Sequence, residues 1–186
     1  MLALGLIRAL LILPGVVVHE LAHYYFCRLA GAAVHEVVFF RLGDPAGYVS
    51  HAPPRRLSLH CLIVAGPLLV NSTLALGLFA LAAHQIQVLQ PLDQPVGLPG
   101  WLSLVVPLWW GLVIALHALP SRGDIEGLWQ VVGWHLQRRH LGAVLALPVT
   151  GVLGLLCLGR QVWLHWVYAG ALGGLAWWAV VGRAGG

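Results

Sequence analysis

Long apolar runs dominate this sequence, and their length limits the folds that the chain can adopt. Several approach the roughly 20 residues that an α-helix needs to cross the hydrocarbon core of a bilayer. The chain of 186 residues is 60% hydrophobic and 9% charged, whereas a soluble domain carries far more charge on its surface. We therefore predict an all-α polytopic membrane protein, embedded in the lipid bilayer, with about five transmembrane helices. The predicted spans cover about 2–30, 57–83, 101–118, 141–158 and 162–181.

The charged residues are few and unevenly distributed. The formal net charge is +4, and every cation is an arginine. This density is too low for a nucleic-acid-binding surface and suits arginines that set membrane topology. If the segment after the first span is cytoplasmic, only Arg8 and Arg160 lie outside, which predicts an outside N-terminus, an outside loop at 84–100 and an inside C-terminus. The arginines then inside are Arg28, Arg41, Arg55, Arg56, Arg122, Arg138, Arg139 and Arg183.

A more polar segment follows the first apolar run. Two runs rich in β-branched and aromatic residues, 36–42 and 47–51, flank a turn of Gly, Asp, Pro and Ala residues. Such runs on either side of a turn are typical of two paired strands. The sequence therefore predicts a small β-hairpin within 34–51.

One polar motif interrupts the first apolar run, which argues against a cleaved signal peptide there. His19, Glu20 and His23 form the pattern H-E-x-x-H. Residues four apart lie on one face of a helix, so both imidazoles can reach one ion, and Zn²⁺ binds imidazole nitrogen readily. Glu20 lies about 100° around the helix from His19, where it can accept a proton from an activated water without binding the metal. Charged groups in a span are costly, so a metal site explains this motif better than packing does.

A catalytic zinc commonly takes three protein ligands, so the third ligand has to come from elsewhere in the chain. Asp124 follows a predicted break in the third span that is marked by Pro120 and Gly123. Unwound backbone at membrane depth is tolerated only where it is buried in protein or lines a cavity. We predict that Asp124 is the third ligand. Two alternatives stay open: Asp124 could cap the following helix, or Glu126 could supply the carboxylate.

Together these motifs resemble the site-2 protease family. The resemblance rests on H-E-x-x-H in the first span, on the sequence GPLLVN at 66–71 in the second, and on the broken span that carries Asp124. It covers about 16–127. It implies an intramembrane zinc metalloprotease that hydrolyses peptide bonds of membrane-spanning substrate helices.

The resemblance also implies roles for individual residues. Family members bind zinc through the two histidines and the aspartate, and they use the glutamate as a general base. They have an asparagine in the second core span, and a hairpin ending in Gly-Tyr-Val that guides the substrate. The matching residues are His19, His23 and Asp124 for zinc, Glu20 and Asn71 for catalysis, and Gly47, Tyr48 and Val49 for substrate binding.

The sequence departs from the family pattern at two places. Three residues rather than two separate Pro67 from Asn71, which rotates Asn71 by about 100° on an ideal helix. The family's Asp-Gly reads Asp-Ile-Glu-Gly at 124–127, and the second proline before it is missing. Asn71 could instead make an interhelical hydrogen bond, and the hairpin could be an interfacial element anchored by aromatic side chains.

We expect two parts: a metalloprotease membrane core at 1–140, with its hairpin at 34–51, and an additional transmembrane helix pair at 141–186. The pair could serve folding, substrate access or dimerisation, so a homodimer is a possible assembly. The expected partners are membrane protein substrates, and the arginine asymmetry puts the active site nearer the cytoplasmic side.

Two functions compete with proteolysis: a zinc-binding pseudoprotease that binds membrane clients without cutting them, and a metal carrier. Neither needs a non-ligating carboxylate such as Glu20.

Overall fold

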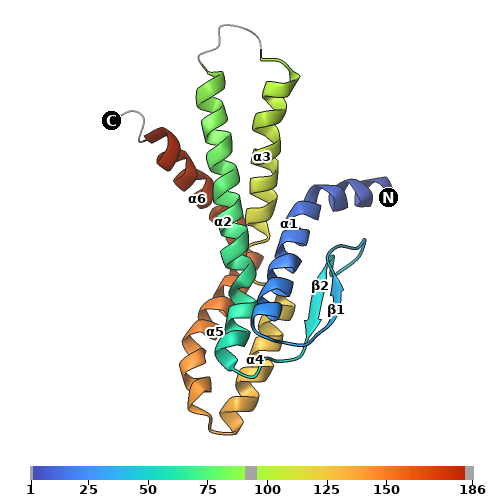
Figure 1. Cartoon of the computed structure of the whole chain (residues 1–186), viewed down its shortest axis with the longest axis vertical. Coiled ribbons are helices and arrows are strands. Elements are labelled where there is room, and N and C mark those ends of the chain that lie inside the picture. Colours follow the sequence, from blue (N-terminus) through green and yellow to red (C-terminus); the bar gives the residue numbers. More distant parts are fainter. Residues whose placement is uncertain (1, 91–95, 183–186) are drawn as a thin grey trace.

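The computed structural model describes residues 2–90 and 96–182, which form a helical bundle with one β-hairpin (Figure 1). The predicted fold class is confirmed. Arg183 and residues 91–95 of the predicted outer loop lie outside the described residues. The elements are α1 (Leu2–Leu29), β1 (Val34–Val38), β2 (Tyr48–His51), α2 (Leu57–Leu89), α3 (Leu98–Leu116), α4 (Arg122–Gln137), α5 (Leu141–Gly159), the 3₁₀ turn η1 (Arg160–Val162), α6 (Leu164–Trp177) and the π-helical turn η2 (Trp178–Gly182).

Five helical segments within the described residues are long and apolar enough to cross a membrane, as predicted. They are Gly5–Leu29, Leu57–Leu89, Leu98–Leu116, Leu141–Val162 and Leu164–Gly182. The shorter helix α4 is not one of them. Within α1, Pro14 removes a backbone donor, and Figure 1 shows the N-terminal part of this helix turned away from the rest.

The central helix α2 connects two levels of packing. Its 33 residues extend roughly 50 Å at about 1.5 Å per residue, which exceeds the thickness of a bilayer core. Its first half forms an apolar cluster with α4 and α5, and its second half forms another with α3 and α6. The first cluster includes Val64, Leu128 and Leu153, and the second includes Phe79, Ile114 and Leu172.

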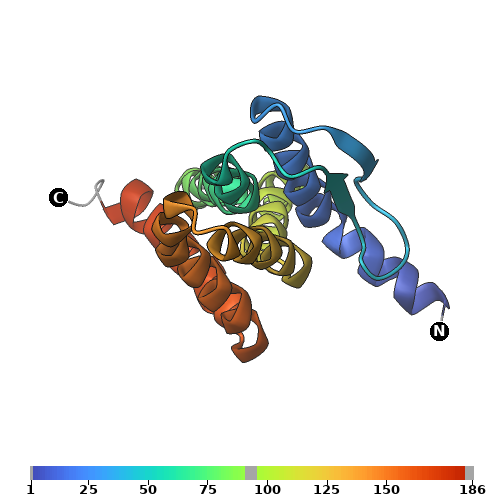
Figure 2. The ribbon, with the colours of Figure 1, turned by 90° about the horizontal axis from the view of Figure 1, so that it is seen from below.

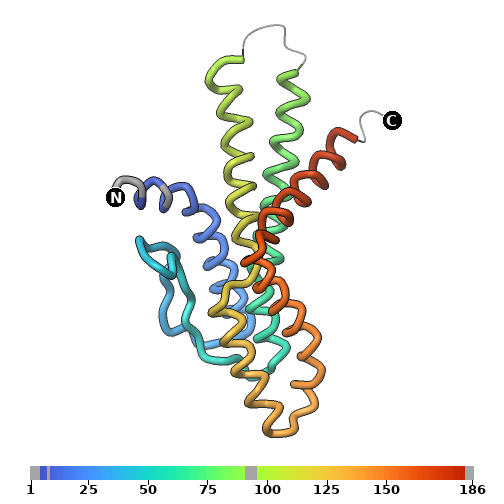
Figure 3. The backbone as a smooth tube through the Cα atoms, turned by 180° about the vertical axis from the view of Figure 1, so that it is seen from behind, coloured from blue at the N-terminus to red at the C-terminus, as the bar shows by residue number. Residues whose placement is uncertain are grey.

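Helices α5 and α6 follow one another in the same direction, as the course of the tube in Figure 3 shows. They are not a side-by-side pair, because α5 packs beside the first half of α2 and α6 beside its second half. The end of α6 therefore points toward the end of the molecule where α2 ends and α3 begins (Figure 1). The inside C-terminus predicted from the arginines would require α5 and α6 to cross the membrane in opposite directions.

The β-hairpin lies beside α1, on the side of the molecule away from α5 and α6 (Figure 2). Its strands are antiparallel, with Val37 opposite Val49 and Val38 opposite Tyr48. Both strands are shorter than the predicted runs, and residues 39–42 belong to the connection rather than to β1. At the other side of α1, the missing side chain of Gly66 in α2 leaves room for the ring of Phe26, so the two helices approach closely.

Candidate metal centre

Helix α1 presents the two histidines of H-E-x-x-H toward α2 and toward the break between α3 and α4. His19 donates its Nδ1 proton to the carbonyl oxygen of His117 (2.6 Å), and His23 donates its Nδ1 proton to the carbonyl oxygen of Ile63 (3.1 Å). Because a carbonyl oxygen only accepts, each neutral ring has its lone pair on Nε2. Both side chains are buried. Metal-binding histidines are oriented by their neighbours in the same way.

The free imidazole nitrogens converge with the carboxylate of Asp124. The Nε2 atoms of His19 and His23 lie 3.2 Å apart, and Oδ1 of Asp124 lies 3.1 Å from Nε2 of His23. Ligand atoms around a tetrahedral zinc, at about 2.0–2.1 Å from the metal, would be separated by roughly 3.3 Å. Two lone pairs this close repel one another unless a cation or a proton lies between them. The three predicted ligands are thus brought together, and the group could hold a metal ion.

Asp124 has a second structural role at the start of α4. Its Oδ2 accepts the backbone N–H of Ser121 (2.7 Å), and Ser121 Oγ accepts the backbone N–H of Asp124 (3.3 Å). This is a capping box. One carboxylate oxygen caps the helix while the other faces His23, so the two alternatives weighed for Asp124 are compatible. The rival carboxylate, Glu126, is exposed and does not belong to the metal-ligand group.

The predicted break in the third span is present between α3 and α4, at 117–121. Residues 118–120 are buried and the two flanking residues are half-buried, so the carbonyl groups of the segment need partners. Side chains from three other parts of the chain donate to carbonyl groups in or just before the break. The pairs are His19 with His117 (2.6 Å), Asn71 with Ile114 (3.2 Å) and Arg160 with Leu119 (2.9 Å). Helix α1, helix α2 and the turn η1 that follows α5 therefore all hold the segment that leads into Asp124.

Asn71 is fully buried between α2 and α3. Its bond to Ile114 is the interhelical hydrogen bond that was considered as the alternative to an active-site role. Asn71 is not among the residues that line the cavity beside Asp124. Its Oδ1 has no hydrogen-bond partner among the described residues. A catalytic role for Asn71 stays a prediction.

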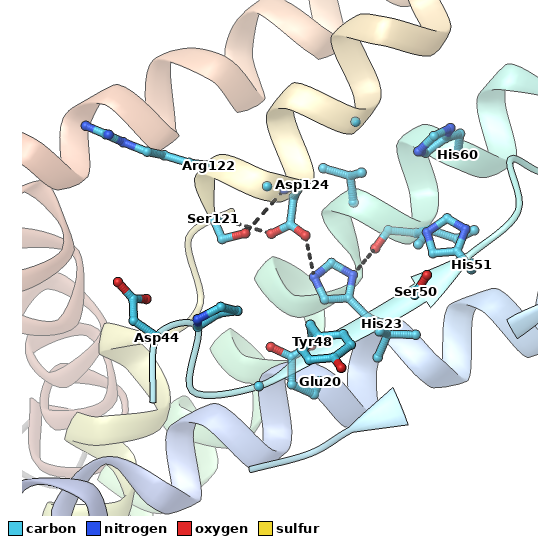
Figure 4. Close-up of a pocket in the computed structure, with 17 residues that line it drawn as sticks. Glu20, His23, Asp44, Tyr48, Ser50, His51, His60, Ser121, Arg122 and Asp124 are labelled. Carbon is cyan, nitrogen blue, oxygen red and sulfur yellow. Dashed lines mark hydrogen bonds and ion pairs between the residues drawn. The ribbon is translucent and has the colours of Figure 1, made fainter. Parts of the chain in front are cut away.

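A cavity of about 590 Å³ opens beside the three candidate ligands and is lined by His23 and Asp124 (Figure 4). Glu20 also lines it but does not belong to the metal-ligand group. The Glu20 side chain is buried on α1, one residue after His19. Its carboxylate can therefore act on a molecule in the cavity without occupying a ligand position.

The hairpin forms one wall of this cavity. Every residue of β2 lines it, whereas none of β1 does. The three residues predicted to bind substrate, Gly47, Tyr48 and Val49, are all on this wall. A Cβ atom on Gly47 would lie 2.8 Å from Cγ of Glu20, so only glycine lets the hairpin backbone come this close to α1.

Tyr48 is also held by the opposite strand. A hydrogen bond to Glu36 raises the pKa of Tyr48 above its ordinary value, with smaller contributions from burial and from the charge of Glu36. The phenol therefore stays protonated at neutral pH. The guanidinium of Arg41 lies over its ring, 5.2 Å from the centroid. These contacts fix the orientation of an aromatic side chain on the cavity wall.

Sequence reasoning missed two histidines of the cavity. His51 at the end of β2 and His60 in α2 both line it, with ring centroids 5.6 Å apart (Figure 4). Their separation in sequence matches no metal-binding motif, and they belong to different elements, so no local signal pairs them. Ser121 also lines the cavity and caps α4. Its capping role could have been predicted from the sequence, because Ser-x-x-Asp at 121–124 is a local capping pattern.

Comparisons with known protein families, with curated proteins and with solved structures find no match to this chain. The chemistry of the site therefore has to be inferred from its own residues and their geometry.

Proposed function

We propose that this protein is an intramembrane zinc metalloprotease that hydrolyses peptide bonds of membrane-spanning substrates, with its site nearer the cytoplasmic side of the membrane. One observation carries the proposal: Glu20 shares a cavity with His23 and Asp124 without belonging to the His-His-Asp group. Labelling of cysteines introduced near 84–100 tests the orientation, and reaction from the cytoplasmic side would contradict it.

Zinc is the metal that the ligand set suits best. Two imidazole nitrogens and one carboxylate oxygen are a common three-ligand set for catalytic zinc, and they leave the fourth tetrahedral position free. A zinc ion held there would polarise a peptide carbonyl and acidify a water molecule. The residues that would hold it are His19, His23 and Asp124.

The protein's own residues supply the remaining steps. Glu20 accepts a proton from the attacking water and delivers it to the nitrogen of the leaving amine, so the proton lost in the first step is returned in the second. The hydrogen bonds to the carbonyl groups of His117 and Ile63 fix the orientation of both imidazoles. A metal carrier or a non-catalytic client-binding protein has no need for a carboxylate at the position of Glu20.

The hairpin suits the presentation of an extended substrate. A substrate helix has to unwind before its backbone is accessible, and an extended chain can add to the edge of a sheet. Strand β2 pairs with β1 on one side and lines the cavity with all of its residues. We therefore propose that the substrate lies along β2, next to Glu20.

Replacing Glu20 with Gln tests the proposed function most directly. Glu20→Gln keeps the shape of the side chain and all three ligands but removes the base, so zinc content should be unchanged and cleavage should fall by at least about 10²-fold. Parent and variant are reconstituted in lipid with single-span substrates, and zinc and cleavage product are measured together. Asp44→Asn is the matched control, because Asp44 lines the same cavity but lies away from His23 in Figure 4.

Two results would count against this mechanism. Substantial cleavage by Glu20→Gln would remove Glu20 from it. A parent protein that binds zinc but cuts none of a broad substrate panel would favour the non-catalytic alternative.

A substitution at Gly47 tests the role of the hairpin. The Cβ of Gly47→Ala would push β2 away from Glu20, so we expect cleavage to fall about tenfold or more, since small displacements of reacting groups are costly. Zinc content should not change. Gly43→Ala is the control, because in the same connection its Cβ would come no closer than 3.8 Å to Arg41. Equal losses in both variants, or loss of zinc, would make the hairpin a purely structural element.

A further inference from the structure

A second cavity lies at the end of the molecule where α2 and α5 begin and α4 ends, opposite the end of α2 and the start of α3 (Figure 1). Its volume is about 650 Å³, and none of its residues lines the cavity of the candidate metal centre. Its lining includes Arg55, Arg56, His135, His140, Leu145 and Val149. The cavity is therefore separate from the candidate metal centre.

Most polar side chains of this cavity are basic, and no acidic side chain lies among them. Arg55 and Arg56 are exposed, and no acidic residue is among those that line the cavity. Within residues 2–90 and 96–182, no ion pair is formed by either arginine. The rings of His135 and His140 lie 5.6 Å apart, and His135 donates its Nδ1 proton to a backbone carbonyl. Arg55 and Arg56 therefore line the cavity without an acidic partner among the described residues.

The beginnings of α2 and α5 add to this positive potential. The N-cap residues, Arg56 and His140, make no side-chain capping hydrogen bond, and neither helix has an acidic residue in its first turn. By contrast, α4 has a complete capping box. The first N–H groups of a helix have no partner within it and attract anions. Two uncapped helix starts thus reinforce the charge of the arginines.

The other part of the cavity is apolar and continues along the outside of α5. Leu145 is 79% exposed and Val149 46% exposed, and both line the cavity. Leu141, at the start of the same helix, is 81% exposed. Since α5 belongs to a segment that can cross a membrane, this surface would face the acyl chains of the bilayer. A molecule with an anionic head and a hydrocarbon chain would cover both this surface and the two arginines.

We propose that this cavity binds the phosphate headgroup of an anionic phospholipid at Arg55 and Arg56, with an acyl chain along Leu145 and Val149. Basic pockets between transmembrane helices bind such headgroups on the cytoplasmic side of membranes. The arginine distribution predicts that this end of the protein is cytoplasmic, where anionic lipids are abundant. The proposal does not depend on proteolytic activity.

The test is a lipid titration of the purified full-length chain, followed by native mass spectrometry. Phosphatidylglycerol is compared with phosphatidylcholine of the same acyl chains, and the parent should bind the anionic lipid more tightly. In the double variant Arg55→Gln/Arg56→Gln that preference should fall by about tenfold or more. The matched control is Arg138→Gln/Arg139→Gln, which removes the same charge at the same end of the molecule from residues that do not line the cavity, and it should keep the preference.

A steric variant keeps the test decisive if the first double variant does not fold. Val149→Trp leaves every charge in place but fills the apolar part of the cavity, so it should weaken lipid binding several-fold. Equal binding of both lipids by the parent would overturn the proposal, and so would equal losses in the two double variants. Soluble glycerol phosphate is added as a competitor. If it displaced the lipid at the same concentration as the lipid, the proposal would also be overturned, because the site would then bind a free anion.

Discussion

The backbone leaves regular helix in two places near the middle of the molecule, at 117–121 between α3 and α4 and at 160–163 between α5 and α6. The first break is buried, with Leu119 and Pro120 inaccessible to solvent. The second is exposed, with Val162 at 76% and Trp163 at 69%. The two breaks interrupt similar apolar stretches, yet only the first leads into a candidate ligand.

The difference lies in how the backbone groups at each break are satisfied. At the buried break, side chains from other helices donate to carbonyl oxygens that would otherwise be costly to bury. These bonds hold the segment in one position relative to α1, and Asp124 is placed with it. At the exposed break, Trp163 adopts a left-handed conformation (φ 65°) that redirects the helix, and the break contributes to the site through its first residue, Arg160, which donates to Leu119. A broken helix can therefore support a precise site where neighbouring side chains hold the break.

The largest expected effect comes from removing the carboxylate that the buried break presents. Asp124→Ala should weaken zinc binding by at least about 100-fold. Loss of a group that only orients a metal ligand lowers metal affinity by about 10–100-fold, and this substitution removes a proposed ligand itself. Zinc affinity is measured by competition with a chelator of known affinity. Ser121→Ala is a control that loses a capping bond, worth about 1 kcal/mol of stability, but keeps the carboxylate. Glu126→Ala controls for charge, and a loss there equal to that of Asp124→Ala would mean that the wrong carboxylate was chosen.

An intermediate effect is expected from loosening the buried break without touching a ligand. Arg160→Leu removes the donor to Leu119, so the break should move, and zinc affinity should fall by about tenfold. Arg160→Lys keeps a donor and should recover part of the loss. Asn71→Leu should have a smaller effect. The Ile114 carbonyl would lose the side-chain donor but would still accept the backbone N–H of His117. If Arg160→Leu bound zinc as tightly as the parent protein, the turn η1 would have no part in positioning Asp124.

The smallest expected effect is at the exposed break. Trp163→Gly relieves a left-handed conformation that costs a non-glycine residue about 1–2 kcal/mol, and the exposed indole contributes little packing. Stability to denaturant in detergent micelles should rise slightly or stay unchanged, and zinc affinity should not change. A clear loss of zinc would show that the exposed break is coupled to the site through more than Arg160 and would remove the contrast between the two breaks.

Much of the fold and the core of the candidate site could be predicted because the relevant signals are local. Apolar runs reveal helices that can span a bilayer, since only a helix satisfies its backbone in lipid. The four-residue spacing of His19 and His23 puts both rings on one face of any helix. Asp124 was identified from the break that precedes it. Each of these inferences needs only the residues within a turn or two.

Contacts between distant segments could not be predicted, and they decide the geometry of the site. No local pattern pairs Arg160 with Leu119, and none selects the carbonyl of Ile63 as the partner of His23, because each contact depends on which helix packs beside which. The common direction of α5 and α6 could not be predicted either. It follows from packing, because α5 contacts the first half of α2 and α6 contacts its second half. The sequence by itself determined the helices, the hairpin and the candidate ligands, since helix and turn geometry are local. Only the tertiary structure decided the convergence of the candidate ligands, because long-range packing places α1, α2 and η1 around the buried break.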